Sequence, residues 1–173
     1  ARRAARPALR AARAGTPLEF ANPDAPAREL RLVIEMGHTH TLVCAFDDRQ
    51  LVAVRSILWG GKTVAESIQR KYEIPYIEAM REMRTKAFIL PSRDGASYDQ
   101  IVFSDTISAQ VRDLGRELKL SILEIETELH GRVAGAEITG GLAGVQNISA
   151  YLTQLIEIPV NPSNFLHHFA TSF

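Results

Sequence analysis

Apolar residues follow two different periods along the chain, and the change between them separates predicted strands from predicted helices. Three runs, 30–35, 41–46 and 51–57, are rich in β-branched and aliphatic residues and are typical of β-strands. Short polar breaks at 37–40 and 47–50 lie between these runs and suit hairpin turns. The pattern therefore predicts three consecutive antiparallel strands.

After Gly61 the apolar residues recur every three or four positions, which is the spacing of one helix face. We expect one helix over 62–72 and a second that Pro75 opens, followed by a loop over 87–96. The second helix would face inward through Ile77, Met80 and Met83. The longest stripe predicts an amphipathic helix that ends near 130–131; its members are Ile107, Val111, Leu114, Leu118, Ile122, Ile125 and Leu129.

The last elements alternate between strand and helix. A short apolar strand is expected over 133–138, then a helix over Ile148, Leu152 and Leu155, then a strand over 158–160. Three antiparallel strands followed by helices and α/β units form the layout of a ribonuclease-H-like α/β half-domain. A generic α+β sandwich is the alternative on the same elements.

Composition favours a single globular domain and excludes several other classes of protein. The chain has 173 residues and 19.1 kDa, which favours one domain with a real core. No run approaches the roughly 20 apolar residues that a membrane-spanning helix needs. Cys44 is the single cysteine, which excludes an internal disulfide and a cysteine-rich zinc module. On its predicted strand we expect it to be a small buried hydrophobe.

The net charge of zero hides two regions of opposite character. Residues 1–14 carry five arginines and no acid, and the remainder has 15 basic against 20 acidic residues. We interpret 1–28 as a solvated basic linker and expect no nucleic-acid partner, although arginine-rich arms can bind nucleic acid or anionic lipid. The absence of an initial Met suggests a fragment of a longer protein.

The last eleven residues, 163–173, form a predicted tail. Phe165, Phe169 and Phe173 recur every four residues, which suits a docking helix. Such a helix could pack on its own domain or on a partner, and both interpretations stay open. The tail has no Lys or Arg, so it lacks the basic face of a membrane-targeting helix.

Two glycine-containing turns are the candidate binding elements. The first turn lies between two strands and would point N–H groups and hydroxyls at phosphate oxygens; its candidates are Gly37, His38, Thr39 and Thr41. The second lies between a strand and a helix, where glycines let a ligand approach the backbone; its candidates are Gly140, Gly141 and Leu142. Each turn alone is also the ordinary end of a strand.

No catalytic or metal-binding set is expected. His38 and His40 are two ligands at most, and the other histidines are distant in sequence. Glu124 and Glu128, four residues apart on the long helix, suit a solvated face better than an acid–base pair. No defensible Ser, His and Asp arrangement occurs. A Walker A loop is absent, because the upstream glycine is missing before Gly61-Lys62-Thr63.

Five segments carry a resemblance to a known family: 33–41, 60–68, 74–79, 138–152 and 158–160. The segment 138–152 combines a glycine-rich turn with a helix that ends in Tyr151-Leu152, and Ile158-Pro159-Val160 follows. Over about 29–162 the chain resembles the second lobe of the actin-like ATPase superfamily. Within it, the chain is similar to the PilM proteins of type IV pili and the cytoplasmic part of the GspL proteins of type II secretion.

The resemblance implies that the first turn would be a phosphate loop and that 139–142 would face the adenosine of a nucleotide. Three departures bear on that expectation. Glu35 stands where the family usually has Asp, and Leu142 stands where it usually has a third glycine. No first-lobe hairpin precedes Glu29. We therefore expect no required cofactor, with ATP and Mg²⁺ bound only together with a missing first lobe.

The resemblance also implies a scaffold rather than an enzyme. It would be a cytoplasmic actin-like protein, held at the bacterial inner membrane through partners or a missing segment. Its partners would be secretion or pilus platform proteins, either the cytoplasmic segment of a membrane protein or the domain of an assembly ATPase, and a homodimer is compatible with the sequence. The alternatives are half of an actin-superfamily ATPase or small-molecule kinase, or an FtsA-like cell-division protein.

Overall fold

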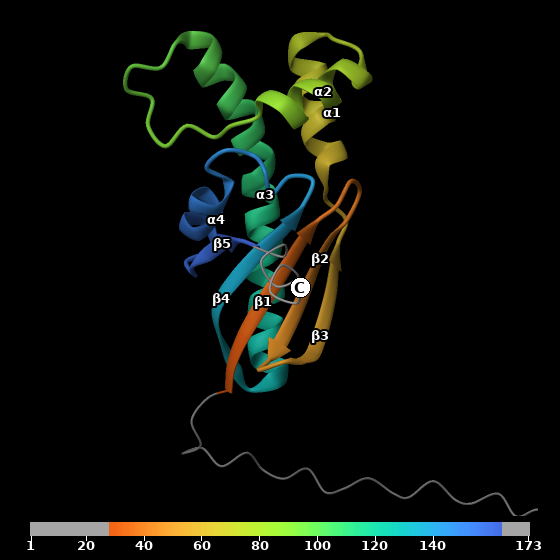
Figure 1. The fold of residues 1–173 in the computed structure, drawn as a ribbon, viewed down its shortest axis with the longest axis vertical. Coiled ribbons are helices and arrows are strands. Elements are labelled where there is room, and N and C mark those ends of the chain that lie inside the picture. Colours follow the sequence, from red (N-terminus) through yellow and green to blue (C-terminus); the bar gives the residue numbers. More distant parts are fainter. Residues whose placement is uncertain (1–27, 164–173) are drawn as a thin grey trace, which may run out of the picture.

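A five-stranded sheet with four helices makes up the part of the chain described by the computed structural model, residues 28–163 (Figure 1). The strands are β1 (Arg28–Met36), β2 (Thr41–Asp47), β3 (Gln50–Ile57), β4 (Gly131–Gly140) and β5 (Val160–Pro162). The helices are α1 (Gly61–Tyr72), α2 (Tyr76–Lys86), α3 (Tyr98–Leu129) and α4 (Ile148–Ile156). The predicted order of elements is confirmed.

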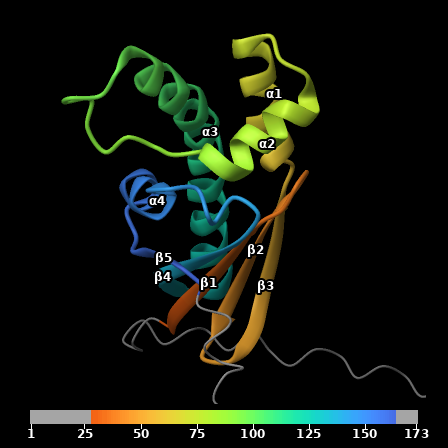
Figure 2. The ribbon, with the colours of Figure 1, turned by 45° about the horizontal axis from the view of Figure 1, so that its top comes forward.

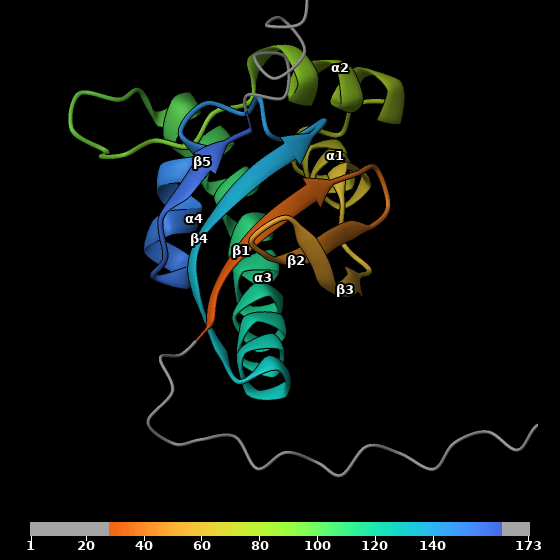
Figure 3. The same ribbon diagram turned by 60° about the horizontal axis from the view of Figure 1, so that its bottom comes forward.

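The sheet is mixed, with strand order β3-β2-β1-β4-β5. The three first strands form an antiparallel meander, as predicted, while β4 and β5 run parallel to β1. A parallel neighbour requires a crossover connection, and α3 supplies it by running the length of the sheet between β3 and β4 (Figure 3). The central strand is β1, which has β2 antiparallel on one side and β4 parallel on the other.

The core lies between one face of the sheet and α3. Alternate residues of β1 point to this face and are buried: Leu30, Leu32, Ile34 and Met36. The helical stripe predicted from the sequence meets them and is buried over Ile107, Val111, Leu114, Leu118, Ile122 and Ile125. The helix α4 packs on α3, so both helices cover the same face of the sheet (Figures 1 and 3).

The bounds of several elements differ from the prediction, and β4 (Gly131–Gly140) is longer than the expected 133–138. The helix α3 begins at Tyr98, nine residues before its apolar stripe, because Ser97 and Gln100 form a capping box. The last strand is Val160–Pro162 rather than 158–160. The strand β1 begins at Arg28, the last residue assigned to the linker. The rest of that linker and the three phenylalanines of the tail lie outside the described residues.

The helix α2 turns a different face to the core than predicted. Ala79 and Met83 are buried and Met80 is half-buried, but Ile77 is 73% exposed. At 3.6 residues per turn, Ile77 lies roughly 140° around the helix from the midpoint of Ala79 and Met83. The three apolar residues thus do not share one face, and the prediction for Ile77 was wrong.

The second face of the sheet is uncovered by any helix in the part of the chain that the structure describes. Val33, Leu42, Cys44 and Phe46 lie on it and are half-buried. Cys44 is therefore less buried than predicted, because it alternates with the core residues of β2. Glu124 and Glu128 do lie on the solvated side of α3, where both pair with Arg55 of β3.

None of the described helices has the length and apolar character that a membrane crossing would need. Within residues 28–163 no three His, Cys, Asp or Glu side chains form a group that could hold a metal ion.

Cys44 offers a test of the environment of this second face. Burial raises the pKa of the Cys44 thiol, and the charge of Glu35 raises it further. Because the thiolate is the reactive form, alkylation by iodoacetamide should accelerate only above the pH expected for a free cysteine. Replacing Glu35→Gln removes the repelling charge, lowers the pKa of the thiol, and should move the rate–pH profile to lower pH.

Glu29→Gln is the matched control, since Glu29 lies on the same strand six residues away. A profile for Glu35→Gln that coincides with those of the control and the parent chain would contradict the assigned role of Glu35.

Candidate functional site

The two turns singled out in the sequence lie side by side, although about a hundred residues separate them. The strands β1 and β4 are parallel neighbours, and their last residues, Met36 and Gly140, face each other in register. The hairpin 37–40 and the glycine turn 140–144 therefore follow at one edge of the sheet (Figure 2). We call these two turns together the loop edge. Ligands of open α/β sheets bind at such carboxyl ends of strands.

The hairpin is tied to the start of α1 by two of its carbonyl groups. The Gly61 N–H donates to the Gly37 carbonyl at 3.0 Å, and the Lys62 N–H donates to the His38 carbonyl at 2.8 Å. The helix α1 has no side-chain cap, so these carbonyls satisfy N–H groups that its first turn leaves open. The N-terminus of α1 is consequently occupied by the hairpin.

Gly60 makes that contact sterically feasible. A Cβ atom at this position would lie 2.5 Å from the His38 carbonyl oxygen and 2.7 Å from the Gly37 oxygen. Real side chains do not approach backbone so closely, so only glycine lets the hairpin reach the helix. Gly60 is not among the predicted site residues; the available signal was the pair Gly60-Gly61 soon after the end of β3.

The tip of the hairpin keeps exposed donors. Within residues 28–163, no hydrogen bond uses the backbone N–H groups of His38, Thr39 or His40. The three side chains are exposed; the Thr39 hydroxyl lies 2.8 Å from His40 Nδ1, and the Tyr76 hydroxyl lies 3.3 Å from His38 Nε2. Successive free N–H groups in a turn are suited to an anion. Tyr76 reaches this tip from α2, a placement that local sequence could not signal.

Thr41 has a different place from the one expected. It is fully buried, and its hydroxyl donates to the Trp59 carbonyl at 2.9 Å. The bond joins the start of β2 to the chain just after β3. The hydroxyl of Thr41 therefore points into the protein and does not face the tip of the hairpin.

The glycine turn presents its backbone rather than its side chains. Gly140 has φ 94°, and a Cβ atom there would lie 2.4 Å from the Met36 carbonyl oxygen. Gly141 is exposed, with no atom within 4 Å of a Cβ built on it. Leu142 is only 2% exposed and packs in the core beside Gly61, so its side chain does not crowd the turn.

The helix after the glycine turn begins at Ile148, the first residue of the predicted helix. The side chain of Asn147, just before it, donates to the Ile89 carbonyl at 2.8 Å. The start of α4 is thus tied to the loop before α3 by the hydrogen bond from Asn147. Glu35 lies on β1, and its partner in the β1–β4 register is Thr139, near the end of β4.

A family model for the type IV pilus assembly protein PilM matches residues 8–172, nearly the whole chain. The chain belongs to the PilM family. No curated protein matches the chain. The match is to the pilus proteins, one of the two families that the sequence resembles.

Solved structures with an actin-like fold are similar to this PilM-family chain. The PilM structure of a PilM–PilN type IV pilus biogenesis complex is 22% identical, with a TM-score of 0.64, over 80% of the chain and 36% of that structure's chain. MreB5 of Spiroplasma citri bound to AMPPNP is 17% identical, with a TM-score of 0.59, over 78% and 48%. The ethanolamine utilization protein EutJ of Carboxydothermus hydrogenoformans is 17% identical, with a TM-score of 0.58, over 76% and 43%.

These likenesses confirm the actin-like, ribonuclease-H-like fold predicted from the sequence. The PilM-family chain spans between a third and a half of the length of the three structures. It is a pilus-related actin-like protein.

Substitutions at Gly140 and Gly141 test the close approach of the glycine turn to β1. Gly140 makes that approach, whereas Gly141 lies beside open space. Gly140→Ala places a side chain in a left-handed conformation and against the Met36 carbonyl. We expect it to lower the free energy of unfolding by about 2–4 kcal/mol. Gly141→Ala enters open space and should change it by less than about 0.5 kcal/mol. Urea unfolding followed by circular dichroism measures both.

Equal losses for the two variants would contradict the assigned close approach of Gly140 to β1.

Proposed function

We propose that this chain is the second lobe of an actin-like scaffold that docks partner proteins during type IV pilus assembly. The observation that carries the proposal is the match of the PilM family model to residues 8–172. The similar solved PilM was determined as a complex with PilN, which supports protein docking as the activity. The match to pilus proteins favours a pilus platform over a type II secretion platform.

The partner in this proposal is a pilus platform protein, which would hold the scaffold at the inner membrane. We place the scaffold ahead of an ATPase or small-molecule kinase half, because the similar solved PilM is part of a complex with another pilus protein. A docking function needs complementary surfaces.

In this proposal, a bound nucleotide would act as a structural clasp that holds the two lobes together. The loop edge fits one side of a phosphate and nucleoside site: the free N–H groups at 38–40 would hold phosphate oxygens. The exposed backbone of Gly140 and Gly141 would lie against the nucleoside. Glu35 is the acid placed to orient a hydrated Mg²⁺ there. The opposite side of the site would come from a first lobe.

Docking is tested by titrating the full-length protein with the PilN protein of the same organism in a calorimeter. We expect saturable one-to-one binding. A matched titration with an unrelated membrane-extracted protein controls for detergent and surface effects. Absence of binding to PilN and to the other inner-membrane proteins of the same pilus system would overturn the docking function.

The clasp is tested by nucleotide binding to the full-length protein. Gly141→Phe puts a ring into the open space beside the turn and should weaken Mg-ATP binding at least about ten-fold, the loss expected when a bulky group fills a ligand's place. Ala134→Phe, at an exposed position near the other end of β4, is the control and should leave the affinity unchanged.

Unaltered ATP affinity in Gly141→Phe, with binding intact in the parent protein, would contradict a nucleotide at the loop edge. Sustained ATP turnover by the purified protein would favour the enzyme over the scaffold.

A further inference from the structure

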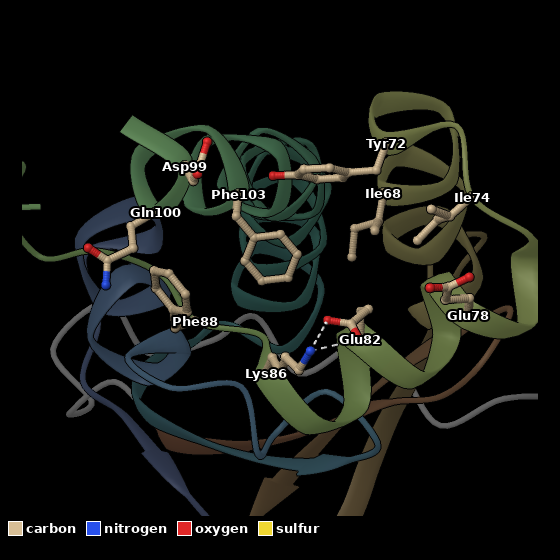
Figure 4. Close-up of a pocket in the computed structure, with 10 residues that line it drawn as sticks. All are labelled: Ile68, Tyr72, Ile74, Glu78, Glu82, Lys86, Phe88, Asp99, Gln100 and Phe103. Atoms are coloured by element: carbon tan, nitrogen blue, oxygen red, sulfur yellow. Dashed lines mark hydrogen bonds and ion pairs between the residues drawn. The ribbon is translucent and has the colours of Figure 1, made fainter. Parts of the chain in front are cut away.

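A cavity of about 410 Å³ opens between α1, α2 and the first turns of α3 (Figure 4). We call it the helical pocket; its walls are Ile68, Tyr72, Ile74, Phe88 and Phe103. Its volume lies within the range of about 300–1,000 Å³ that is usual for ligand sites. The loop edge contributes none of its lining residues.

Three aromatic rings from different elements meet in this pocket. The Phe103 ring of α3 lies with its centroid 6.0 Å from that of Tyr72 and 5.7 Å from that of Phe88, both at tilted angles. Tyr72 is 40% exposed, and Phe88 and Phe103 are half-buried. Aromatic side chains that stay partly exposed around one cavity are more typical of a binding surface than of a core.

Carboxylates dominate the rim of the pocket. Glu78 and Glu82 project from α2, and Asp99 lies on the opposite side of the mouth, in the first turn of α3 (Figure 4). Lys86, the one basic residue of the lining, pairs with Glu82 at 2.8 Å. Glu78 and Asp99 therefore leave a net negative rim around an apolar interior.

The chemistry of Tyr72 agrees with this description. Burial raises the pKa of the Tyr72 hydroxyl, and the charge of Asp99 raises it further. The wall of the pocket at Tyr72 is thus partly buried and close to the negative charge of Asp99.

The helix α2 separates the helical pocket from the loop edge. Ala79 and Met83 face the core, while Tyr76 on one flank reaches His38 of the hairpin. Glu78 and Glu82 on the other flank face the pocket. The two surfaces are distinct, although one helix carries both.

We propose that the helical pocket docks a short basic segment of a partner protein that inserts one aromatic or branched aliphatic side chain. The inserted side chain would pack on the three rings, and an Arg or Lys on either side of it would pair with Glu78 and Asp99. An arginine would also lie over an exposed aromatic face. The occupant follows from charge complementarity, because a neutral or acidic segment would leave the rim carboxylates unpaired or repelled.

This inference names the chemistry of a partner and so rests in part on the proposed docking function. Its test uses a synthetic peptide in place of the partner, so that its failure is distinguishable from a failure to bind PilN.

The probe is a capped arginine-phenylalanine-arginine tripeptide, titrated into the ¹⁵N-labelled chain of 173 residues and followed by NMR. Amide signals of Tyr72, Phe88 and Phe103 should shift in a saturable way. The charge-reversed glutamate-phenylalanine-glutamate peptide should bind about ten-fold more weakly or less, and arginine-alanine-arginine should lose the apolar anchor. Binding of the charge-reversed peptide with equal affinity would overturn the proposal.

Rim variants test the pocket without endangering the fold, because both positions are exposed. The pair Glu78→Gln and Asp99→Asn should weaken binding of the basic probe about three-fold to ten-fold. Glu117→Gln, an exposed acid farther along α3, is the control and should have no effect. Unchanged affinity in the rim variants, or shifts confined to another surface, would count against the pocket.

The chain's own basic arm is the competing occupant. It has five arginines in residues 1–14. If the probe binds only after residues 1–14 are removed, the arm rather than a partner fills the pocket, and the proposal is wrong. If the probe binds neither form at millimolar concentration, the pocket has no affinity for this chemistry, and the proposal is also wrong.

Discussion

The parallel contact between β1 and β4 is the constraint on which the other features depend. It brings the Met36 carbonyl to within 2.4 Å of where a side chain at Gly140 would start, so a residue other than glycine there would strain the contact. Parallel strands also require a crossover, which the 32 residues of α3 provide. The same pairing sets the two loops of the loop edge beside each other. The position of a ligand site there would thus depend on the register between β1 and β4, and not on either loop alone.

The hairpin is hydrogen-bonded to both α1 and α2. Its carbonyls at 37 and 38 cap α1, and Tyr76 of α2 meets His38 from the other side. A phosphate held at the tip would therefore rest against groups that also fix α1 and α2. Those two helices form part of the walls of the helical pocket, together with Phe88 and the first turns of α3. The hydrogen bonds thus connect the hairpin with two of the helices that line the pocket.

Sequence patterns were sufficient for the elements and for the general location of the loop edge. Runs of β-branched and aliphatic residues between polar breaks marked the strands. The stripe from Ile107 to Leu129 marked α3, because burial on one face of a helix leaves a periodic trace. The orientation of individual side chains was not predictable in the same way. Thr41 and Leu142 were expected to face a ligand, yet both are buried by contacts with distant segments, Trp59 and Gly61. Nor could periodicity reveal the pocket, whose rings come from three separate elements.

The two surfaces differ in what they need from the rest of the protein. The loop edge offers donors on one side only, so a nucleotide there would be exposed unless a first lobe covers it. The helical pocket, in contrast, has its walls and its acidic rim within residues 68–103. Binding at the pocket should therefore persist in the isolated chain, whereas nucleotide binding should require the longer protein. If the lobes clasp a nucleotide, the scaffold would hold its shape through one surface and recruit a partner through the other, and each activity could be lost without the other.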